Sequence, residues 1–193
     1  MKKDLYRNEG KENINAKGFF KLKNVAVVVF IMTLAIMRFT NLGDKGLIPY
    51  SGDTGTLDMM FHYSYQYAYG MLNGLGDTGR SIYLRFFIID IIFILSFAVV
   101  QAEIIKYLVR KAVLPFKWNR LSLLSYTRGM FDILENLFLA VTLIRFSTGS
   151  TVFIRIAGIM TTSKWIVFIL SLATMTVLLL MAILRPKTFK KTE

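Results

Sequence analysis

The sequence predicts an all-α integral membrane protein, an antiparallel four-helix transmembrane bundle with an amphipathic interfacial helix between the first and second spans. Three observations predict this fold. Of the 193 residues, 54% are hydrophobic and the mean hydropathy is positive. The chain contains four long apolar segments, and its basic residues are concentrated in alternate connections between them. A soluble core of this length does not require so much apolar sequence.

The four apolar segments define the spans and the domain boundaries. A helix needs about 20 residues to cross the hydrocarbon, and the predicted spans are 24–41, 81–106, 121–145 and 164–185. Together they form one transmembrane domain over residues 21–185, with a basic tail at 1–20 and a short tail at 186–193. No small-residue cleavage site follows the first apolar segment, so we expect it to be a retained helix and not a signal peptide.

The distribution of basic residues predicts the topology. Seven basic residues precede the first span, five lie between the second and third spans if Lys106 at the end of the second is included, and four lie at or after Arg185 at the end of the fourth, which is sixteen of the 24 in the chain. The positive-inside rule therefore predicts a multi-pass protein of the cell membrane with both termini cytoplasmic. The net charge of +12 then indicates contact with anionic headgroups on the cytoplasmic side and not nucleic-acid binding.

The outer connection between the first two spans predicts the interfacial helix, over about 56–73. Apolar residues recur there every three or four positions, and Asp58 falls in the first turn, where the helix dipole favours an acid. Four tyrosines from Tyr63 to Tyr69 alternate as in a strand, but a lone strand would have no partner. We therefore expect a helix with its tyrosines at headgroup level.

The second outer connection predicts a short interfacial segment over 152–160. Thr161, Thr162 and Ser163 would then provide an N-cap for the last span.

His62, in the first outer connection, has no second histidine or cysteine to join it and is a poor metal ligand. The chain has no cysteine, which excludes disulfides and thiolate metal sites.

The third span contains a polar stripe. Asp132, Glu135 and Asn136 are spaced i, i+3 and i+4 and share one helical face, which extends back through Arg128 and Ser125. Each ionisable side chain at the centre of a span costs about 3 kcal/mol or more, so it persists where a partner, a water-filled cavity or a function compensates.

The second span carries Asp90 on one line with Tyr83 and Gln101, so Asp90 is also expected to point inward. Counted at about 1.5 Å per residue, Asp90 and Glu135 lie roughly 14 and 15 Å from the outer ends of their spans. Adjacent antiparallel helices could therefore bring the two carboxyls together.

These residues form a candidate ligand-binding site in the outer half of the bundle, and the sequence leaves open whether a metal ion is among its ligands. The candidate residues are Asp90, Asp132, Glu135, Asn136, Arg85, Arg128, Tyr83, Arg80 and Lys164. In one interpretation the carboxyls receive a proton, a cation or a small polar ligand. In the other, basic residues neutralise the acids in a closed ion-pair network that fixes helix register, and five are available for it: Arg128, Arg85, Arg38, Arg145 and Lys164. A lysine beside a tryptophan, as at Lys164, is typical of an interfacial anchor, and it joins the site only if its face meets the carboxyls.

The motifs resemble those of a known group of proteins. They are Gly79-Arg80-Ser81-Ile82-Tyr83, Asp90, Asp132-Ile133-Leu134-Glu135-Asn136 and Lys164-Trp165. From Thr56 to Leu184 the chain resembles an uncharacterised bacterial family of small four-span membrane proteins, with Gly-Arg-x-x-Tyr at the start of the second span and Asp-x-x-Glu-Asn in the third. The chain departs from that family in its tyrosine-rich outer segment and longer basic tail. The resemblance implies a four-span fold and no activity.

Known catalytic motifs are missing from the sequence, so we predict no catalytic residues and no cofactor. There is no paired-aspartate signature of a headgroup transferase, no aspartate-rich prenyl-diphosphate motif, no histidine cluster and no Gly-x-Ser-x-Gly element. Binding or transport of a proton, a cation or a small polar ligand is the first hypothesis. An accessory or immunity-type protein, acting through a membrane partner or a second copy, is the next. A lipid-modifying enzyme using a carboxyl as general acid or base is the third.

Overall fold

The structure is a computed structural model that describes residues 23–51, 55–146 and 151–184, and in this part of the chain it contains helices and no strand. The first helix covers 23–39. It is followed by α2 (Asp44–Ser51), the 3-10 helix η1 (Leu57–Met59), α3 (Tyr65–Gly74), α4 (Gly76–Lys111), the 3-10 helix η2 (Phe116–Ser122), α5 (Leu123–Ile144) and α6 (Thr151–Leu184).

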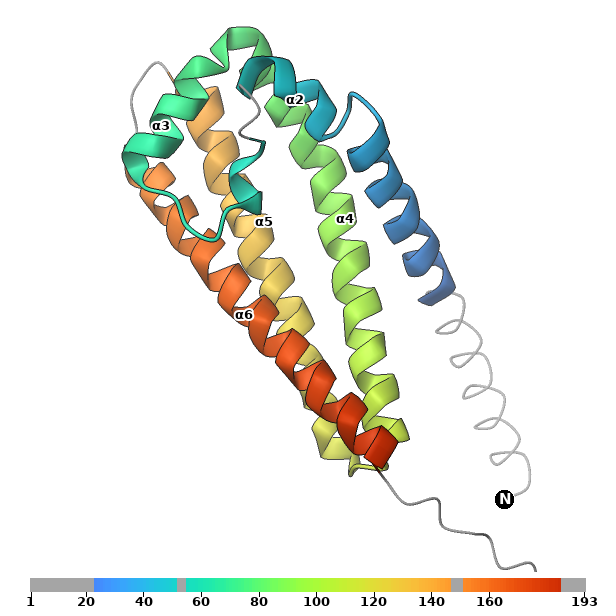
Figure 1. Cartoon of the computed structure of the whole chain (residues 1–193). Helices are drawn as coiled ribbons and strands as arrows, with labels where there is room; N and C mark the ends of the chain where they lie inside the picture. The colour runs from blue at the N-terminus through green and yellow to red at the C-terminus, as the bar shows by residue number, and fades with distance from the viewer. Residues whose placement is uncertain (1–22, 52–54, 147–150, 185–193) are drawn as a thin grey trace, which may run out of the picture.

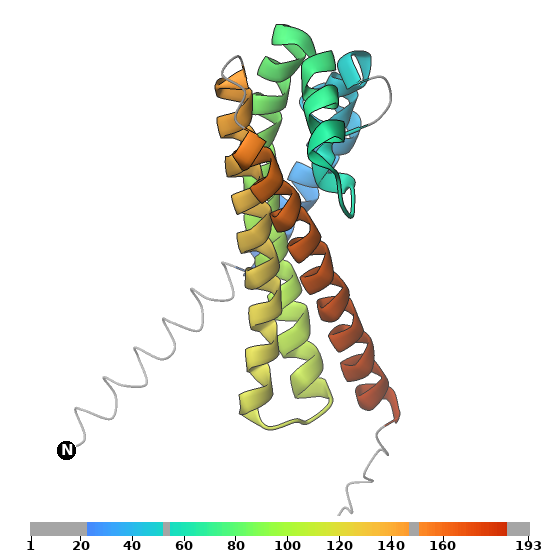
Figure 2. The same ribbon diagram turned by 90° about the vertical axis from the view of Figure 1, so that its left-hand side faces the viewer.

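The 23–39 helix, α4, α5 and α6 are the long elements, and each runs antiparallel to the one before it (Figure 1). Figure 2 shows α4 and α5 side by side with α6 inclined across α5. The loop with η2 lies at one end of the molecule, and α2 and α3 lie at the other. Among the described residues, α4 and α6 are long and apolar enough to cross a membrane.

The second long helix extends beyond the predicted span at both ends. The span was expected over 81–106, and α4 is Gly76–Lys111. Gly76 has a φ of 61°, in the left-handed region that glycine adopts without steric cost, and this residue turns the chain from α3 into α4. At the other end Arg110 and Lys111 occupy the last turn, where the helix dipole favours positive charge.

The predicted break in the last helix is wrong. Instead of an interfacial segment over 152–160 followed by a separate span, α6 is continuous from Thr151 to Leu184. Thr161 and Thr162 do not cap a new helix, because their hydroxyls donate to the carbonyls of Ala157 and Gly158 one turn earlier. Such bonds satisfy a threonine within a helix and let the helix continue.

The helix predicted over 56–73 forms only in its second half. Ser64 caps α3 by accepting a hydrogen bond from the backbone N–H of Tyr67, so the helix begins at Tyr65. The first half is η1, whose Leu57 and Asp58 are buried. The hydroxyl of Tyr83 on α4 accepts a hydrogen bond from the backbone N–H of Leu57 at 3.0 Å. The first half of the predicted segment is therefore packed against the long helices. The prediction that it lies on the outer surface is wrong.

The buried apolar residues form two clusters at different heights. One joins η1, α3 and the first turns of α4 to the end of α5, around Leu57, Tyr83 and Leu139. The other joins the end of α4 to α6, around Ile105 and Leu178. The stretch of α4 and α5 between these clusters carries the buried polar side chains, so the candidate site is a layer closed above and below by apolar packing.

Candidate functional site: a polar layer beside a cavity

The polar face of α5 is confirmed by burial. Asp132, Glu135 and Asn136 are all buried together with Ser125, as their helical spacing predicts. Gly129 lies on the same face, and a Cβ placed there would be 3.4 Å from side-chain carbons of Ile94 and Ala98 on α4. A glycine at this point lets α4 approach α5 closely.

Two bases and two acids form a chain of ion pairs. Arg128 Nη2 lies 2.7 Å from Asp132 Oδ2, and Lys164 Nζ lies 2.8 Å from Asp132 Oδ1 and 2.6 Å from Glu135 Oε2. Lys164 is only 4% exposed, so it is a buried partner of α5 and not the interfacial anchor that its neighbour Trp165 suggested. Two positive and two negative charges balance within this network.

Of the five bases available to the closed network, Arg128 and Lys164 form ion pairs with its acids. Arg85 is exposed and takes part in none of these pairs. Arg128 is held further by aromatic rings, with its guanidinium carbon 4.6 Å from the centre of Phe97 and 5.5 Å from that of Phe168. Rings at these distances attract a cation through their negative faces.

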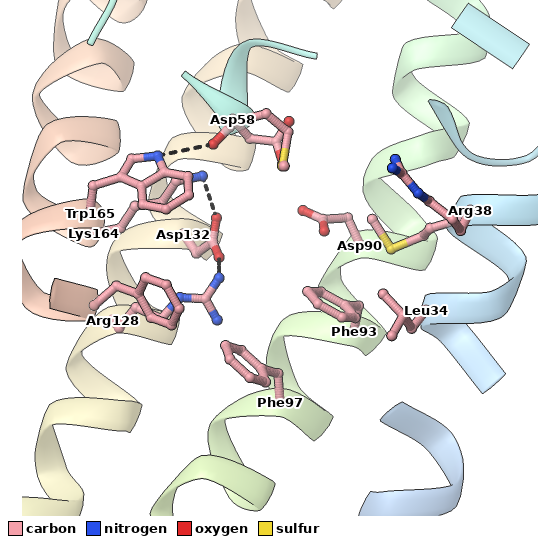
Figure 3. Close-up of a pocket in the computed structure, with 13 residues that line it drawn as sticks. Leu34, Arg38, Asp58, Asp90, Phe93, Phe97, Arg128, Asp132, Lys164 and Trp165 are labelled. Atoms are coloured by element: carbon pink, nitrogen blue, oxygen red, sulfur yellow. Dashed lines mark hydrogen bonds and ion pairs between the residues drawn. The ribbon is translucent and has the colours of Figure 1, made fainter. Parts of the chain in front are cut away.

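Asp90 lies opposite the network, on α4. Its carboxylate accepts a hydrogen bond from Asn136 Nδ2 at 2.6 Å, which confirms that the two helices bring this level of α4 and α5 together. Asp90 is 3% exposed, and within the described part of the chain it forms no ion pair. In Figure 3 its carboxylate points across an open space toward Asp132 and Arg128.

Asp58 is a fourth acid that the sequence did not place in the site. It comes from η1, is 9% exposed, and its Oδ1 has no hydrogen-bond partner among the described residues. The indole N–H of Trp165 donates to its backbone carbonyl at 3.3 Å, which holds η1 against α6. Ser64 was the available signal, because a good N-cap at that position moves the helix start beyond Asp58 and leaves the acid in a loop.

These residues surround a cavity of about 370 Å³ at the meeting of five elements (Figure 3). Its charged lining is Asp58, Asp90 and Asp132 with Arg38, Arg128 and Lys164. Phe93, Phe97, Trp165 and Phe168 form much of its apolar wall. Phe93 and Phe97 are one turn apart on α4 and close to Asp90 in the sequence. This spacing could have indicated that both rings line the same site as Asp90, but the prediction did not use it. Small-molecule sites have this combination of apolar walls and few polar groups.

Three predicted site residues lie elsewhere. Arg85 is exposed. Arg80 pairs with Asp77 at 2.6 Å and lies 4.3 Å from the centre of the Phe146 ring, near the start of α4. Tyr83 belongs to the apolar cluster and holds η1 through its hydroxyl. Four of the other predicted residues line the cavity: Asp90, Asp132, Arg128 and Lys164. Glu135 and Asn136 do not line it, but they contact the lining residues Lys164 and Asp90.

No arrangement of three or more His, Cys, Asp or Glu side chains that could hold a metal ion occurs among the residues described. His62 Nδ1 lies 3.1 Å from the hydroxyl of Thr162, which gives it a hydrogen-bond partner on α6.

Tyr63, just before α3, is buried. This burial, together with the nearby charge of Glu135, raises the pKa of its hydroxyl well above the ordinary value.

No known protein family, no curated protein sequence and no solved structure matches this chain. The resemblance to small four-span bacterial membrane proteins therefore stays a prediction.

Proposed function

We propose that this chain is a four-span protein of the cell membrane, with both termini cytoplasmic, whose cavity binds or transports a cationic ligand at Asp90. The observation that carries the proposal is the contrast between the acids of the polar layer. Asp132 and Glu135 have ammonium or guanidinium partners, whereas Asp90, equally buried and facing the cavity, has an amide hydrogen bond and no ion pair among the described residues.

Exposed apolar faces support the four-span arrangement. In the most apolar 18-residue window of α6, only 11% of the residues are buried, whereas the core helix of a soluble protein would be mostly buried. The 23–39 helix likewise exposes Val25, Val28, Ile31 and Met32, and α5 exposes Met130 and Leu137. Apolar surface of this extent is unfavourable in water and favourable in lipid. The polar face of α5 is then the face turned away from lipid.

Charge supports a cation as the ligand. An ionised carboxylate removed from water costs several kcal/mol unless a positive charge compensates it. Lys164 and Arg128 are engaged by Asp132 and Glu135, so they compensate Asp90 poorly. Arg38, the third base of the cavity lining, forms no ion pair with Asp90 in the described part of the chain. A cation that enters the cavity, or a proton, would relieve this cost. An anion would meet three acids in the cavity lining and would have to compete with Asp132 for Arg128 and Lys164.

A structural role for the ion-pair network is the second candidate, and the chain of pairs between α5 and α6 favours it. Arg128, Asp132, Lys164 and Glu135 join two helices at a fixed register, as an accessory or immunity-type protein with a membrane partner would need. The two roles use different residues, because Asp90 stands outside the network. Variants at Asp90 and at Asp132 therefore separate them.

The test compares Asp90→Asn with Asp77→Asn in purified protein. Asp90→Asn keeps an oxygen that can accept from Asn136 but removes the charge, and Asp77 is an exposed acid near the start of the same helix. We expect cations of a panel of alkali, alkaline-earth and ammonium salts to raise the Tm of the wild type and of Asp77→Asn and to leave Asp90→Asn unchanged. If a proton is the ligand, the Tm depends on pH in the wild type and no longer does so in Asp90→Asn.

Equal responses in Asp90→Asn and Asp77→Asn would contradict binding at Asp90. A large loss of folded yield in Asp132→Asn, with no cation acting through Asp90, would favour the structural role.

A further inference from the structure

We propose that the ligand is an organic cation, a substituted ammonium with an apolar group, whose positive charge lies between Asp90 and Asp58 and whose apolar group packs against Phe93 and Trp165. This inference rests on the proposed function and specifies the class of ligand. It follows from the size of the cavity, the position of two acids that form no ion pair among the described residues, and the nature of the walls.

Size argues against a bare ion. The cavity has a volume of about 370 Å³, while a water molecule in the liquid occupies about 30 Å³. Sites for small organic molecules begin at roughly 300 Å³. A proton or an alkali ion would leave most of the space to water, whereas a compact organic molecule would fill it.

Two acids from separate elements are available to a positive group. Asp90 comes from α4 and Asp58 from η1, and both line the cavity. In the described chain neither forms an ion pair, and Asp58 Oδ1 is buried without a hydrogen-bond partner. Hydrogen-bond donors on an ammonium, or the charge alone of a quaternary ammonium, would satisfy both carboxylates. Two carboxylates are too few for Ca²⁺, which takes six to eight oxygen ligands.

The walls favour an organic cation over a hydrated inorganic one. Phe93 lies one turn along α4 from Asp90, and Trp165 lies on α6 across the cavity, with Leu34 and Met37 contributed by the 23–39 helix. Such walls provide no oxygen ligands to an inorganic ion, but they bury the alkyl or aryl part of an amine. The same layer already holds an organic cation of the protein itself, since the guanidinium of Arg128 lies over Phe97 and Phe168.

A substituted ammonium could come from two sources, a free amine or the headgroup of a phospholipid. Both present the same charge to Asp90 and Asp58. They differ in that a headgroup amine is already present in the membrane, so it would compete with any added amine.

The experiment measures binding of benzyltrimethylammonium to the full chain in nanodiscs of phosphatidylglycerol, a lipid without an ammonium group. Neopentylbenzene, which has the same shape and no charge, is the neutral comparison. NaCl and MgCl₂ are the inorganic comparisons. The variants are Asp90→Asn, Asp58→Asn and Phe93→Leu, with the exposed Asp77→Asn and Phe116→Leu as matched controls.

We expect benzyltrimethylammonium to bind and neopentylbenzene not to bind. Asp90→Asn should weaken the Kd at least tenfold and Asp58→Asn several-fold, because each removes one of the two charges that face the ammonium. Phe93→Leu should weaken it about threefold through the lost aromatic contact. The controls should bind as the wild type does. If Asp90→Asn does not fold, Asp58→Asn and Phe93→Leu still decide the question.

Other outcomes are informative in different ways. Binding of Na⁺ or Mg²⁺ through Asp90, with no binding of the ammonium, overturns this inference and leaves the proposed function standing. Equal binding of neopentylbenzene also overturns it, because charge would then be irrelevant. The absence of any cation effect through Asp90 overturns both. Within the expected result, a weaker apparent affinity in phosphatidylcholine nanodiscs identifies the lipid headgroup as a competitor, and an unchanged affinity identifies a free amine.

Discussion

At the scale of single residues, Lys164 determines how the buried charges are arranged. Its ammonium lies between Asp132 and Glu135 and links α6 to α5. With Lys164 and Arg128 in place, two of the four acids of the layer are neutralised within the protein. Asp90 and Asp58 form no ion pair with any residue that the structure describes, and this difference between neighbouring carboxylates is the basis of the proposed ligand site.

Replacing Lys164 with methionine should destabilise the protein strongly. Lys164→Met keeps an unbranched side chain, one heavy atom shorter, but leaves Glu135 buried without its cation, and breaking a buried pair in this way costs about 3–5 kcal/mol. Lys111→Met, at the exposed end of α4, is the control and should cost less than about 1 kcal/mol. Equilibrium unfolding in detergent measures both. The double variant Lys164→Met/Glu135→Gln should recover part of the loss, and no recovery would contradict the pairing.

At the scale of elements, the contact between α4 and α5 depends on small residues and on the polar pair that joins them. Gly129 and Ala98 let the two helices approach, and Asn136 then reaches Asp90 across the interface. The polar layer lies between the two apolar clusters.

A change of size at Gly129 tests this contact. Gly129→Ala should be neutral or stabilising within about 1 kcal/mol, because alanine favours a helix over glycine and its Cβ would meet Ile94 and Ala98 at an ordinary contact distance of 3.4 Å. Gly129→Leu should destabilise by about 1–3 kcal/mol through overpacking. Thermal unfolding measures both. Met130→Leu, at an exposed neighbour, should change little, and a loss in Met130→Leu as large as in Gly129→Leu would argue against a specific helix contact.

At the scale of the whole molecule, the loop with η2 lies at the opposite end from α2 and α3 (Figure 1). In the proposed four-span arrangement these ends face opposite sides of the membrane. The basic residues before, between and after the spans then place η2 in the cytoplasm and α3 outside.

Single-cysteine labelling tests this topology directly, because the chain has no cysteine of its own. Tyr67→Cys in α3 and Phe116→Cys in η2 replace exposed residues. An impermeant maleimide should label Tyr67→Cys in intact bacterial spheroplasts and Phe116→Cys only after permeabilisation. Labelling of both positions from the same side would exclude the four-span arrangement.

Several parts of the fold follow from sequence periodicity. The face of α5 with Asp132, Glu135 and Asn136 and the face of α4 with Tyr83 and Asp90 are buried, as helical spacing predicts. Helix ends were less predictable. The turn at Gly76 and the continuity of α6 past Thr161 depend on backbone conformation and on local hydrogen bonds, to which hydropathy is insensitive.

The sequence by itself determined the helical class, the two helices apolar enough to cross a membrane and the identity of the polar faces, because each of these depends on residue type and spacing along one helix. Only the tertiary structure decided which charges meet. It paired Asp132 and Glu135 with Lys164 and not with Arg85, and it brought Asp58 from a loop to the same cavity as Asp90. The physical reason is that spacing along one helix determines only which side chains point to the same side of that helix. Ion pairs at 2.6 to 2.8 Å also require that two elements have the right relative height and rotation. Packing between the elements sets both.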